Sequence, residues 1–204
     1  MPSITADVRA ADGRIAGPRA LATRQGLVDS LGRLLSSRPF RDIRVIDIAR
    51  AARTSPATFY QYFPSVENAF EVLAAHVAQQ SSTLSSGMPL AGGARAAVDR
   101  WFAFWEDHAP VLRVIDTMAA EGDERFVQAR SVLLSAAGQA LGAALDQRRA
   151  AARATAVPPK ALEGVLVTLL ASAAAHEAGF TAWGTGDELR DSLAFLVTTA
   201  LGTP

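Results

Sequence analysis

Hydrophobic residues recur along this chain at intervals of three and four, the spacing that places side chains on one face of an α-helix. These faces predict helices over residues 18–37, 65–80, 94–108, 110–121, 123–153, 159–183 and 186–201. Two further short helices are predicted between residues 45 and 64. Strand-like alternation of hydrophobic and polar residues is scarce, so the pattern predicts an all-α fold of about nine helices.

A sharp break in the pattern separates the two short helices. In the first of them, the residues spaced for a buried face are Val45, Ile48, Ala49 and Ala52. The pattern stops at Arg53-Thr54. The second helix begins with Ser55, whose hydroxyl can accept a hydrogen bond from a first-turn amide, and Pro56, which has no amide to leave unsatisfied. Pro64 ends it, because the residue before a proline is disfavoured in helical geometry. About two turns remain, enough to lie in a DNA major groove about 12 Å wide.

The second short helix has an apolar and a polar face. Phe59 and Phe63 are four residues apart and can anchor the helix inward. The outward side chains that carry hydrogen-bonding groups are Ser55, Thr58, Gln61 and Tyr62. Spacing alone leaves two interpretations open: a helix-turn-helix that reads DNA, or an ordinary helical hairpin with a polar turn.

The same stretch resembles the N-terminal helix-turn-helix of the TetR/AcrR family of bacterial transcriptional regulators. The matching residues are Ile48-Ala49, Ala52, Ser55, Thr58-Phe59-Tyr60, Tyr62-Phe63 and Ser65. The resemblance implies a flexible arm (residues 1–17), a three-helix DNA-binding domain (18–64) and a C-terminal helical ligand-binding and dimerisation domain (65–204). It also implies a homodimer that represses transcription at a palindromic operator in double-stranded DNA and leaves it when a small molecule binds.

By this resemblance, the DNA contacts come from the two short helices and the turn between them. The expected set is Arg44, Arg53 and Tyr60 on phosphates, Thr58, Gln61 and Tyr62 at base edges, and Ser55, which caps the helix and contacts the DNA backbone. Thr54 is also expected to belong to this set. Three positions depart from the family pattern. Arg53 replaces a turn glycine at a position that often takes positive φ, Arg44 replaces a capping Thr, and Val66 replaces a Lys. Arg53 and Val66 support a second hypothesis, a ligand-binding or protein-interaction dimer with weakened DNA affinity.

Charge is unevenly distributed along a chain whose net charge is zero. Residues 1–64 hold ten arginines against five aspartates, whereas the remainder holds ten basic against fifteen acidic residues. A positive N-terminal part is typical of a region that meets a polyanion such as DNA, although a charge excess is also compatible with an ordinary solvated face.

The most aromatic segment lies in the predicted C-terminal domain. Its large side chains are Trp101, Phe102, Phe104 and Trp105. Aromatic residues at helical spacing indicate either core packing or a pocket with flat walls. The resemblance favours a pocket for a largely apolar effector. The expected lining is Trp101, Trp105, Met118, Phe126, Leu133 and Phe180, with Ser172 and His176 as polar contacts.

The last two predicted helices are apolar over wide faces, marked by Leu162, Val165, Leu166, Leu169 and Leu170, and by Leu189, Leu193, Leu196 and Val197. An intramolecular core is one interpretation. The resemblance favours a four-helix bundle with the same helices of a second copy, which presents two reading helices to a palindrome.

Other chemistry is not indicated by the sequence. There are no cysteines, and the three histidines lie on different predicted helices without the spacing of a zinc site or a catalytic triad. The start of the chain has no signal-peptide pattern, and residues 165–175, the longest apolar stretch, fall short of the about 20 needed to cross a bilayer. We therefore expect a cytoplasmic protein with no metal, cofactor or membrane partner. An enzyme that uses the aromatic pocket is the third, least favoured hypothesis.

Overall fold

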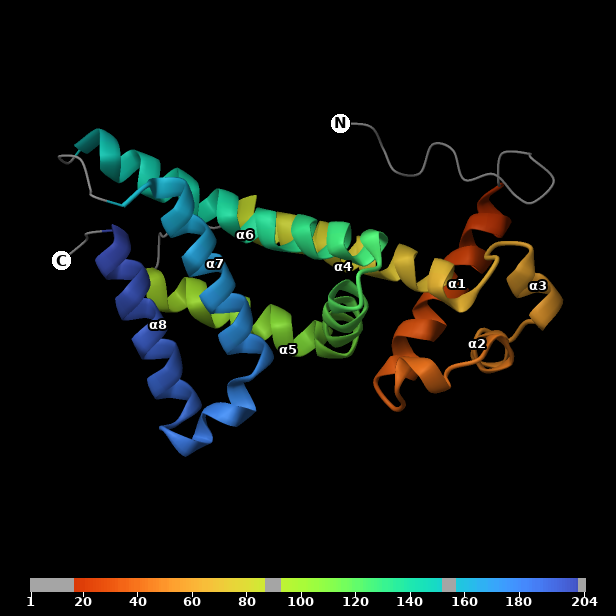
Figure 1. Cartoon of the computed structure of the whole chain (residues 1–204). Coiled ribbons are helices and arrows are strands. Elements are labelled where there is room, and N and C mark those ends of the chain that lie inside the picture. Colours follow the sequence, from red (N-terminus) through yellow and green to blue (C-terminus); the bar gives the residue numbers. More distant parts are fainter. Residues whose placement is uncertain (1–16, 87–92, 152–156, 202–204) are drawn as a thin grey trace. The chain divides into compact units, whose positions relative to one another are not determined.

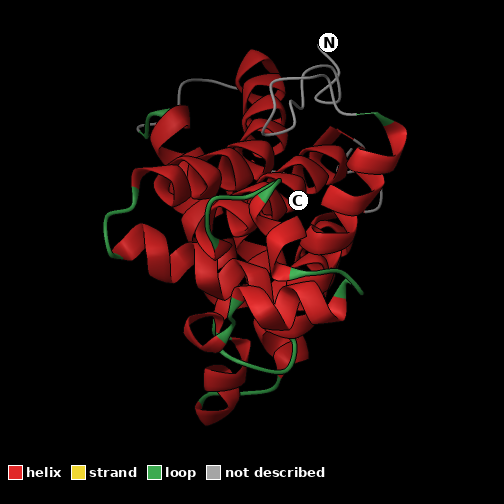
Figure 2. Cartoon of the chain, turned by 90° about the vertical axis from the view of Figure 1, so that its right-hand side faces the viewer, coloured by secondary structure: helices red, strands yellow, loops and turns green. Residues whose placement is uncertain are grey.

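The computed structural model describes residues 17–86, 93–151 and 157–201, and these residues form helices joined by short turns (Figure 1). The elements are α1 (Pro18–Leu35), the 3-10 helix η1 (Phe40–Asp42), α2 (Val45–Ala51), α3 (Pro56–Tyr60), α4 (Val66–Ser86), α5 (Gly93–Ala120), α6 (Glu124–Ala151), α7 (Pro159–Ala175), the 3-10 helix η2 (Glu177–Ala182) and α8 (Gly186–Leu201). No strand occurs among the described residues (Figure 2). The all-α prediction is confirmed. The predicted flexible arm lies almost wholly outside the described part.

The chain divides into two compact units within α4, between His76 and Val77. The predicted boundary between the DNA-binding and ligand-binding domains, between residues 64 and 65, precedes this helix and stays a prediction. The first half of α4 therefore belongs to the N-terminal unit and the second half to the C-terminal unit.

The N-terminal unit has a small core that follows the predicted helical faces. Its fully or almost fully buried side chains are Leu27, Val28, Leu31, Ile48, Phe59, Phe63 and Phe70. Phe40 of η1 packs on Phe70 of α4, with 4.9 Å between ring centroids. This core holds α2 and α3 together and leaves their other faces to solvent.

The C-terminal unit is built around α5, which packs against α6, α7 and α8. This central position explains why the four aromatic residues of α5 (Trp101, Phe102, Phe104 and Trp105) are all buried, with exposed fractions of 2–6%. A helix with neighbours on several sides can bury residues that point in different directions.

Three predicted helix boundaries are wrong. The predicted helices over 94–108 and 110–121 are one helix, because α5 continues through Pro110. A proline in a helix removes one backbone hydrogen bond, and the burial of Val111, Leu112 and Ile115 just after it offsets this cost. The predicted loop over 81–93 begins later, since α4 extends to Ser86; residues 87–92 of that loop lie outside the described part.

The helix predicted to end at residue 183 instead ends at Ala175 and is followed by η2. His176 is the C-terminal cap of α7, with φ −123° and ψ 21°. Its ring Nδ1 lies 2.9 Å from the Ser172 carbonyl oxygen, and its backbone N–H donates to the same oxygen. The ring and the backbone N–H of His176 thus both meet the Ser172 carbonyl at the C-terminal end of the helix.

Candidate DNA interface and ligand cleft

The turn between α2 and α3 is closed by two backbone hydrogen bonds. The Thr54 N–H donates to the Ala49 carbonyl at 2.8 Å, and the Arg53 N–H donates to the Arg50 carbonyl at 3.1 Å. This is the Schellman arrangement, which places the residue after the cap in left-handed geometry. That residue is Arg53, at φ 55°, and it is the non-glycine residue with positive φ in the described chain. A side chain at this position has a steric cost that glycine avoids.

The start of α2 has half of a capping box. Arg44 provides no side-chain acceptor, but the Asp47 carboxylate accepts the Arg44 backbone N–H at 3.1 Å. Asp47 also pairs with Arg38 at 3.6 Å. Because Asp47 satisfies the backbone of residue 44, the exposed Arg44 side chain is not needed in the cap.

The start of α3 is capped as its sequence predicts. Ser55 Oγ accepts the Thr58 N–H at 3.1 Å and lies 3.0 Å from Thr58 Oγ1. Phe59 and Phe63 are buried beneath the helix. Regular α-helix ends at Tyr60, but turns of backbone hydrogen bonding continue to Phe63.

The opposite face of this segment is open to solvent. Tyr60 is 58% exposed. Of the other residues predicted to contact DNA, Arg44, Arg53, Ser55 and Gln61 are exposed, and Thr54, Thr58 and Tyr62 are half-buried. All eight therefore come from one continuous segment, residues 44–62, which is held to the core by the buried Phe59 and Phe63. The predicted set of DNA contacts leaves out Arg41 and Arg50. Both are exposed, and both are among the ten arginines of residues 1–64.

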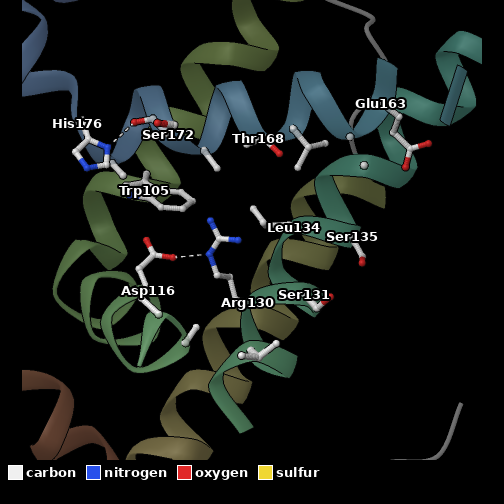
Figure 3. Close-up of a pocket in the computed structure, with 18 of the residues that line it drawn as sticks. Trp105, Asp116, Arg130, Ser131, Leu134, Ser135, Glu163, Thr168, Ser172 and His176 are labelled. Carbon is white, nitrogen blue, oxygen red and sulfur yellow. Dashed lines mark hydrogen bonds and ion pairs between the residues drawn. The ribbon is translucent and has the colours of Figure 1, made fainter. Parts of the chain in front are cut away.

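The C-terminal unit contains a cleft of about 800 Å³ between α5, α6 and α7. Figure 3 shows it with Trp105 at one side and Leu134 at the other. The lining residues are Trp105, Asp116, Ala119 and Ala120 of α5; Val127, Arg130, Ser131, Leu134, Ser135 and Gly138 of α6; and Lys160, Glu163, Gly164, Val167, Thr168, Ala171, Ser172 and Ala175 of α7, followed by His176.

Three of the eight residues predicted to bind ligand line this cleft: Trp105, Ser172 and His176. The other five, which are Trp101, Met118, Phe126, Leu133 and Phe180, are not part of its lining. Phe126 and Leu133 are 0% and 1% exposed and belong to the core. Trp101 is also buried, and Phe180 lies in η2 with its ring 6.3 Å from that of Trp183.

On α6, the predicted and the observed lining residues differ by one position along the helix. Phe126 and Leu133 are seven apart and share the core face, whereas their neighbours Val127 and Leu134 share the cleft face with Arg130. A step of one residue turns the side chain by about 100° around the helix. Hydrophobic spacing identifies both faces but does not say which of them borders an empty space.

The cleft is more polar than the expected lining. Arg130 Nε donates to Asp116 Oδ1 at 2.8 Å, and Lys160 Nζ donates to Glu163 Oε1 at 2.6 Å. The Glu163 carboxylate lies against the backbone of α6 at two glycines. A Cβ at Gly138 would be 2.8 Å from Glu163 Oε1, and one at Gly142 would be 2.5 Å from Glu163 Oε2. These glycines therefore provide the space that the carboxylate occupies.

The second half of α4 contacts two walls of the C-terminal unit. Gln80 Oε1 lies 2.8 Å from His108 Nε2 of α5. The buried Ser81 hydroxyl donates to the Ala78 carbonyl at 2.7 Å and to the Leu133 carbonyl of α6 at 3.3 Å. The same two helices, α5 and α6, form walls of the cleft.

A charged network joins α5 to the start of α8. Arg95 pairs with Asp99, Asp187 and Asp191. Hydrogen bonds to Asp99 and then to Asp191 are the main reason that the pKa of Arg95 is raised. The Thr185 N–H and hydroxyl donate to Glu188 Oε2 at 2.7 and 3.0 Å, and these bonds lower the pKa of Glu188.

Metal-binding clusters and membrane-spanning helices are both absent from the described residues. Within residues 17–86, 93–151 and 157–201, no group of His, Asp and Glu side chains is arranged to hold a metal ion. None of the helices in these ranges is long and apolar enough to span a membrane.

Comparison with known families identifies both parts of the chain. Residues 27–72 match the family described as bacterial regulatory proteins, tetR family, and residues 71–203 match the tetracyclin repressor-like C-terminal domain. The chain belongs to the TetR family of transcriptional regulators. Regulators of this family are non-enzymatic DNA-binding proteins. Comparison with curated protein sequences gives no significant match.

Solved structures with the same fold are numerous. A TetR-family transcriptional regulator from Streptomyces coelicolor is 19% identical, with a TM-score of 0.68 over 92% of this chain and 84% of that one. The fatty acid degradation regulator FadR from Bacillus halodurans is 14% identical, with a TM-score of 0.67 over 90% and 96% of the two chains. Salmonella enterica GusR is 16% identical, with a TM-score of 0.66 over 93% and 99%. At these identities the likeness establishes the fold alone.

Proposed function

We propose that this regulator is a homodimeric repressor that binds a palindromic operator through α3 and leaves it when a small organic molecule occupies the cleft between α5, α6 and α7. The observation that carries the proposal is the anchoring of α3. Phe59 and Phe63 are buried, while Tyr60 and Gln61 are exposed on a helix whose start is capped by Ser55. A short, rigid helix with an exposed polar face is suited to contact base edges and phosphates.

Two exposed apolar faces support the dimer. Val165 and Leu169 of α7 are 62% and 38% exposed, and Phe195 and Leu196 of α8 are 68% and 44% exposed. Apolar surface of this kind is stabilised by burial against a second copy. A two-fold axis through these helices would repeat α3 at two half-sites of a palindrome.

The contacts of α4 support a route from the cleft to the DNA-binding helices. A ligand that separates α5 from α6 would pull on Gln80 through His108 and on Ser81 through Leu133. Because α4 begins in the N-terminal unit, its movement would change the position of α3. A near-complete switch requires the ligand to prefer the released state by about 5.5 kcal/mol.

The test is a fluorescence anisotropy titration of the full-length protein against DNA upstream of its own gene and neighbouring genes. Wild-type protein should bind one sequence selectively, with an affinity that falls as salt rises. Tyr60→Ala and Gln61→Ala should weaken that binding, while Gln128→Ala, which alters an exposed residue of α6, should keep it unchanged. Absence of selective binding by a folded dimer would reject the repressor.

Two observations favour the rival hypothesis of a dimer with weakened DNA affinity. Arg53 occupies left-handed geometry, and Val66 stands at the first position of α4 without a charge for phosphate. Strong salt dependence in the same titration would exclude this rival, because phosphate contacts are its source.

A further inference from the structure

Arg130 is a charged side chain of the cleft with hydrogen-bonding groups that are not all used; the other cation with spare hydrogens, Lys160, pairs with Glu163 and is 85% exposed. Its Nε donates to Asp116 Oδ1 at 2.8 Å, and no acceptor among the described residues takes its two terminal nitrogens. Figure 3 shows the guanidinium between Trp105 and Leu134, with one terminal nitrogen directed toward α7 and the other toward Leu134. The side chain is 44% exposed, so these nitrogens are accessible to a ligand.

The bond to Asp116 orients the guanidinium. It occupies Nε and leaves the end of the group, with both terminal nitrogens, facing the cleft. This end is the part of arginine that matches a carboxylate by two parallel hydrogen bonds. A held arginine also loses less conformational entropy when it binds an anion.

The two acidic residues of the cleft each accept a hydrogen bond from a basic residue. Asp116 accepts from Arg130. Glu163 accepts from Lys160 at 2.6 Å, and its carboxylate lies in the space left by Gly138 and Gly142. Asp116 pairs with Arg130 through Nε, so the terminal nitrogens of Arg130 form the positive end of this pair that a ligand would meet, while the Glu163 carboxylate lies against α6.

Around Arg130 the walls are apolar with a few hydroxyl groups. Buried apolar surface comes from Trp105, Val167 and Ala171. Hydroxyl groups come from Ser131 of α6 and Thr168 of α7. Such a lining suits a molecule with an apolar body and one polar end.

We infer that the effector is an organic carboxylate with an apolar body, that Arg130 is the residue that determines this specificity, and that Asp116 positions it. This inference rests on the proposed function only in taking the cleft as the effector site.

Three probes with one body and different charge test the inference: 4-phenylbutyrate, 4-phenylbutanol and 4-phenylbutylamine. Calorimetry of each probe with the full-length protein should show the carboxylate binding at least about tenfold more tightly than the alcohol, and the amine most weakly, because a hydrogen bond to a charged group is worth roughly that factor. Arg130→Gln should reduce the affinity for the carboxylate to that for the alcohol. Arg130→Lys should restore part of it, since lysine keeps the charge without the two-pronged geometry.

Arg113→Gln is the matched control, because Arg113 is an exposed arginine of α5 that does not line the cleft. It removes the same charge and should leave all three affinities unchanged. Asp116→Asn keeps an acceptor for Nε but removes a negative charge near the ligand. The carboxylate should then bind about threefold more tightly, as expected when one like charge is removed from a partly exposed site.

The inference is overturned if the amine binds as well as the carboxylate, if none of the probes binds, or if Arg130→Gln and Arg113→Gln behave alike. DNA titration of the same protein keeps these outcomes separate from the proposed function. Carboxylate binding through Arg130 without loss of DNA affinity would keep the anion site and reject its role in release. Selective DNA binding with no carboxylate preference would keep the regulator and reject the inference.

Discussion

The two units of this protein differ in how locally their functional surfaces are built. The surface on α2 and α3 comes from one segment of the chain, in which anchors and exposed residues alternate within a few positions. The cleft is built from three helices that are far apart in the sequence. Its character therefore depends on which faces of α5, α6 and α7 meet. Local patterns define the first kind of surface and are insufficient for the second.

The largest expected effect tests whether the N-terminal surface depends on its anchors. Phe59 is fully buried, so Phe59→Ala should destabilise the N-terminal unit by about 3–5 kcal/mol through lost burial and a cavity. Urea unfolding measures the change. Tyr60→Ala, at the exposed neighbouring position, should change stability by less than about 0.5 kcal/mol. Equal effects of the two variants would contradict the assigned faces of α3.

A second prediction separates the two surfaces by function. Gln61→Ala should weaken operator binding by about 1–3 kcal/mol, or about 5- to 150-fold, because an outward amide that contacts a base is lost. It should leave calorimetric binding of 4-phenylbutyrate unchanged. Arg130→Gln should show the reverse pattern. A variant that affected both measurements equally would show that the two surfaces are not independent in binding.

The third prediction concerns the strained turn. Arg53→Gly should raise the stability of the N-terminal unit by about 1 kcal/mol, since glycine adopts φ 55° without a Cβ penalty. If Arg53 also contacts phosphate, the same change should reduce the slope of log affinity against log salt by about 1. Thermal unfolding and salt titrations measure the two effects. A loss of stability in Arg53→Gly would contradict the expected backbone strain at Arg53.

The fourth prediction tests the glycines of α6. Gly142→Ala should gain up to about 1 kcal/mol of helix propensity, but its Cβ would displace the Glu163 carboxylate. The net stabilisation should therefore be smaller than that of Gly164→Ala on α7, where no atom lies within 4 Å of the new Cβ. Thermal unfolding of the two variants gives the comparison. An equal gain in both would mean that Glu163 moves away at no cost.

The smallest expected effect is a pH dependence at the start of α8. The hydrogen bonds from Thr185 lower the folded-state pKa of Glu188. The associated stability is present above the unfolded pKa of a glutamate and is lost as pH falls through the lower folded value. Glu188→Gln should remove this contribution from the pH profile of thermal unfolding between about pH 5 and pH 3. Identical profiles for the variant and the wild type would contradict it.

Much of the N-terminal unit could be predicted because its signals are local. Ser55 and Pro56 start α3, and the spacing of Phe59 and Phe63 assigns its buried face. In the C-terminal unit the same signals were less reliable. Pro110 predicts a helix boundary, yet α5 continues because neighbouring helices bury the residues that follow. The α7 helix ends before His176, which leaves helical geometry with φ −123° and ψ 21°, and hydrophobic periodicity does not reveal this end.

By itself, the sequence determined the helical class and the capped α3 helix, because both depend on contacts within a few residues. The motif at residues 48–65 also indicated the family to which the chain belongs. Only the tertiary structure decided that the cleft takes Trp105, Ser172 and His176 but not Phe126 or Leu133, and that Arg130 stands in it with Asp116. The reason is physical. Helical spacing specifies the faces of a helix, and the packing of three helices decides which face borders an open space.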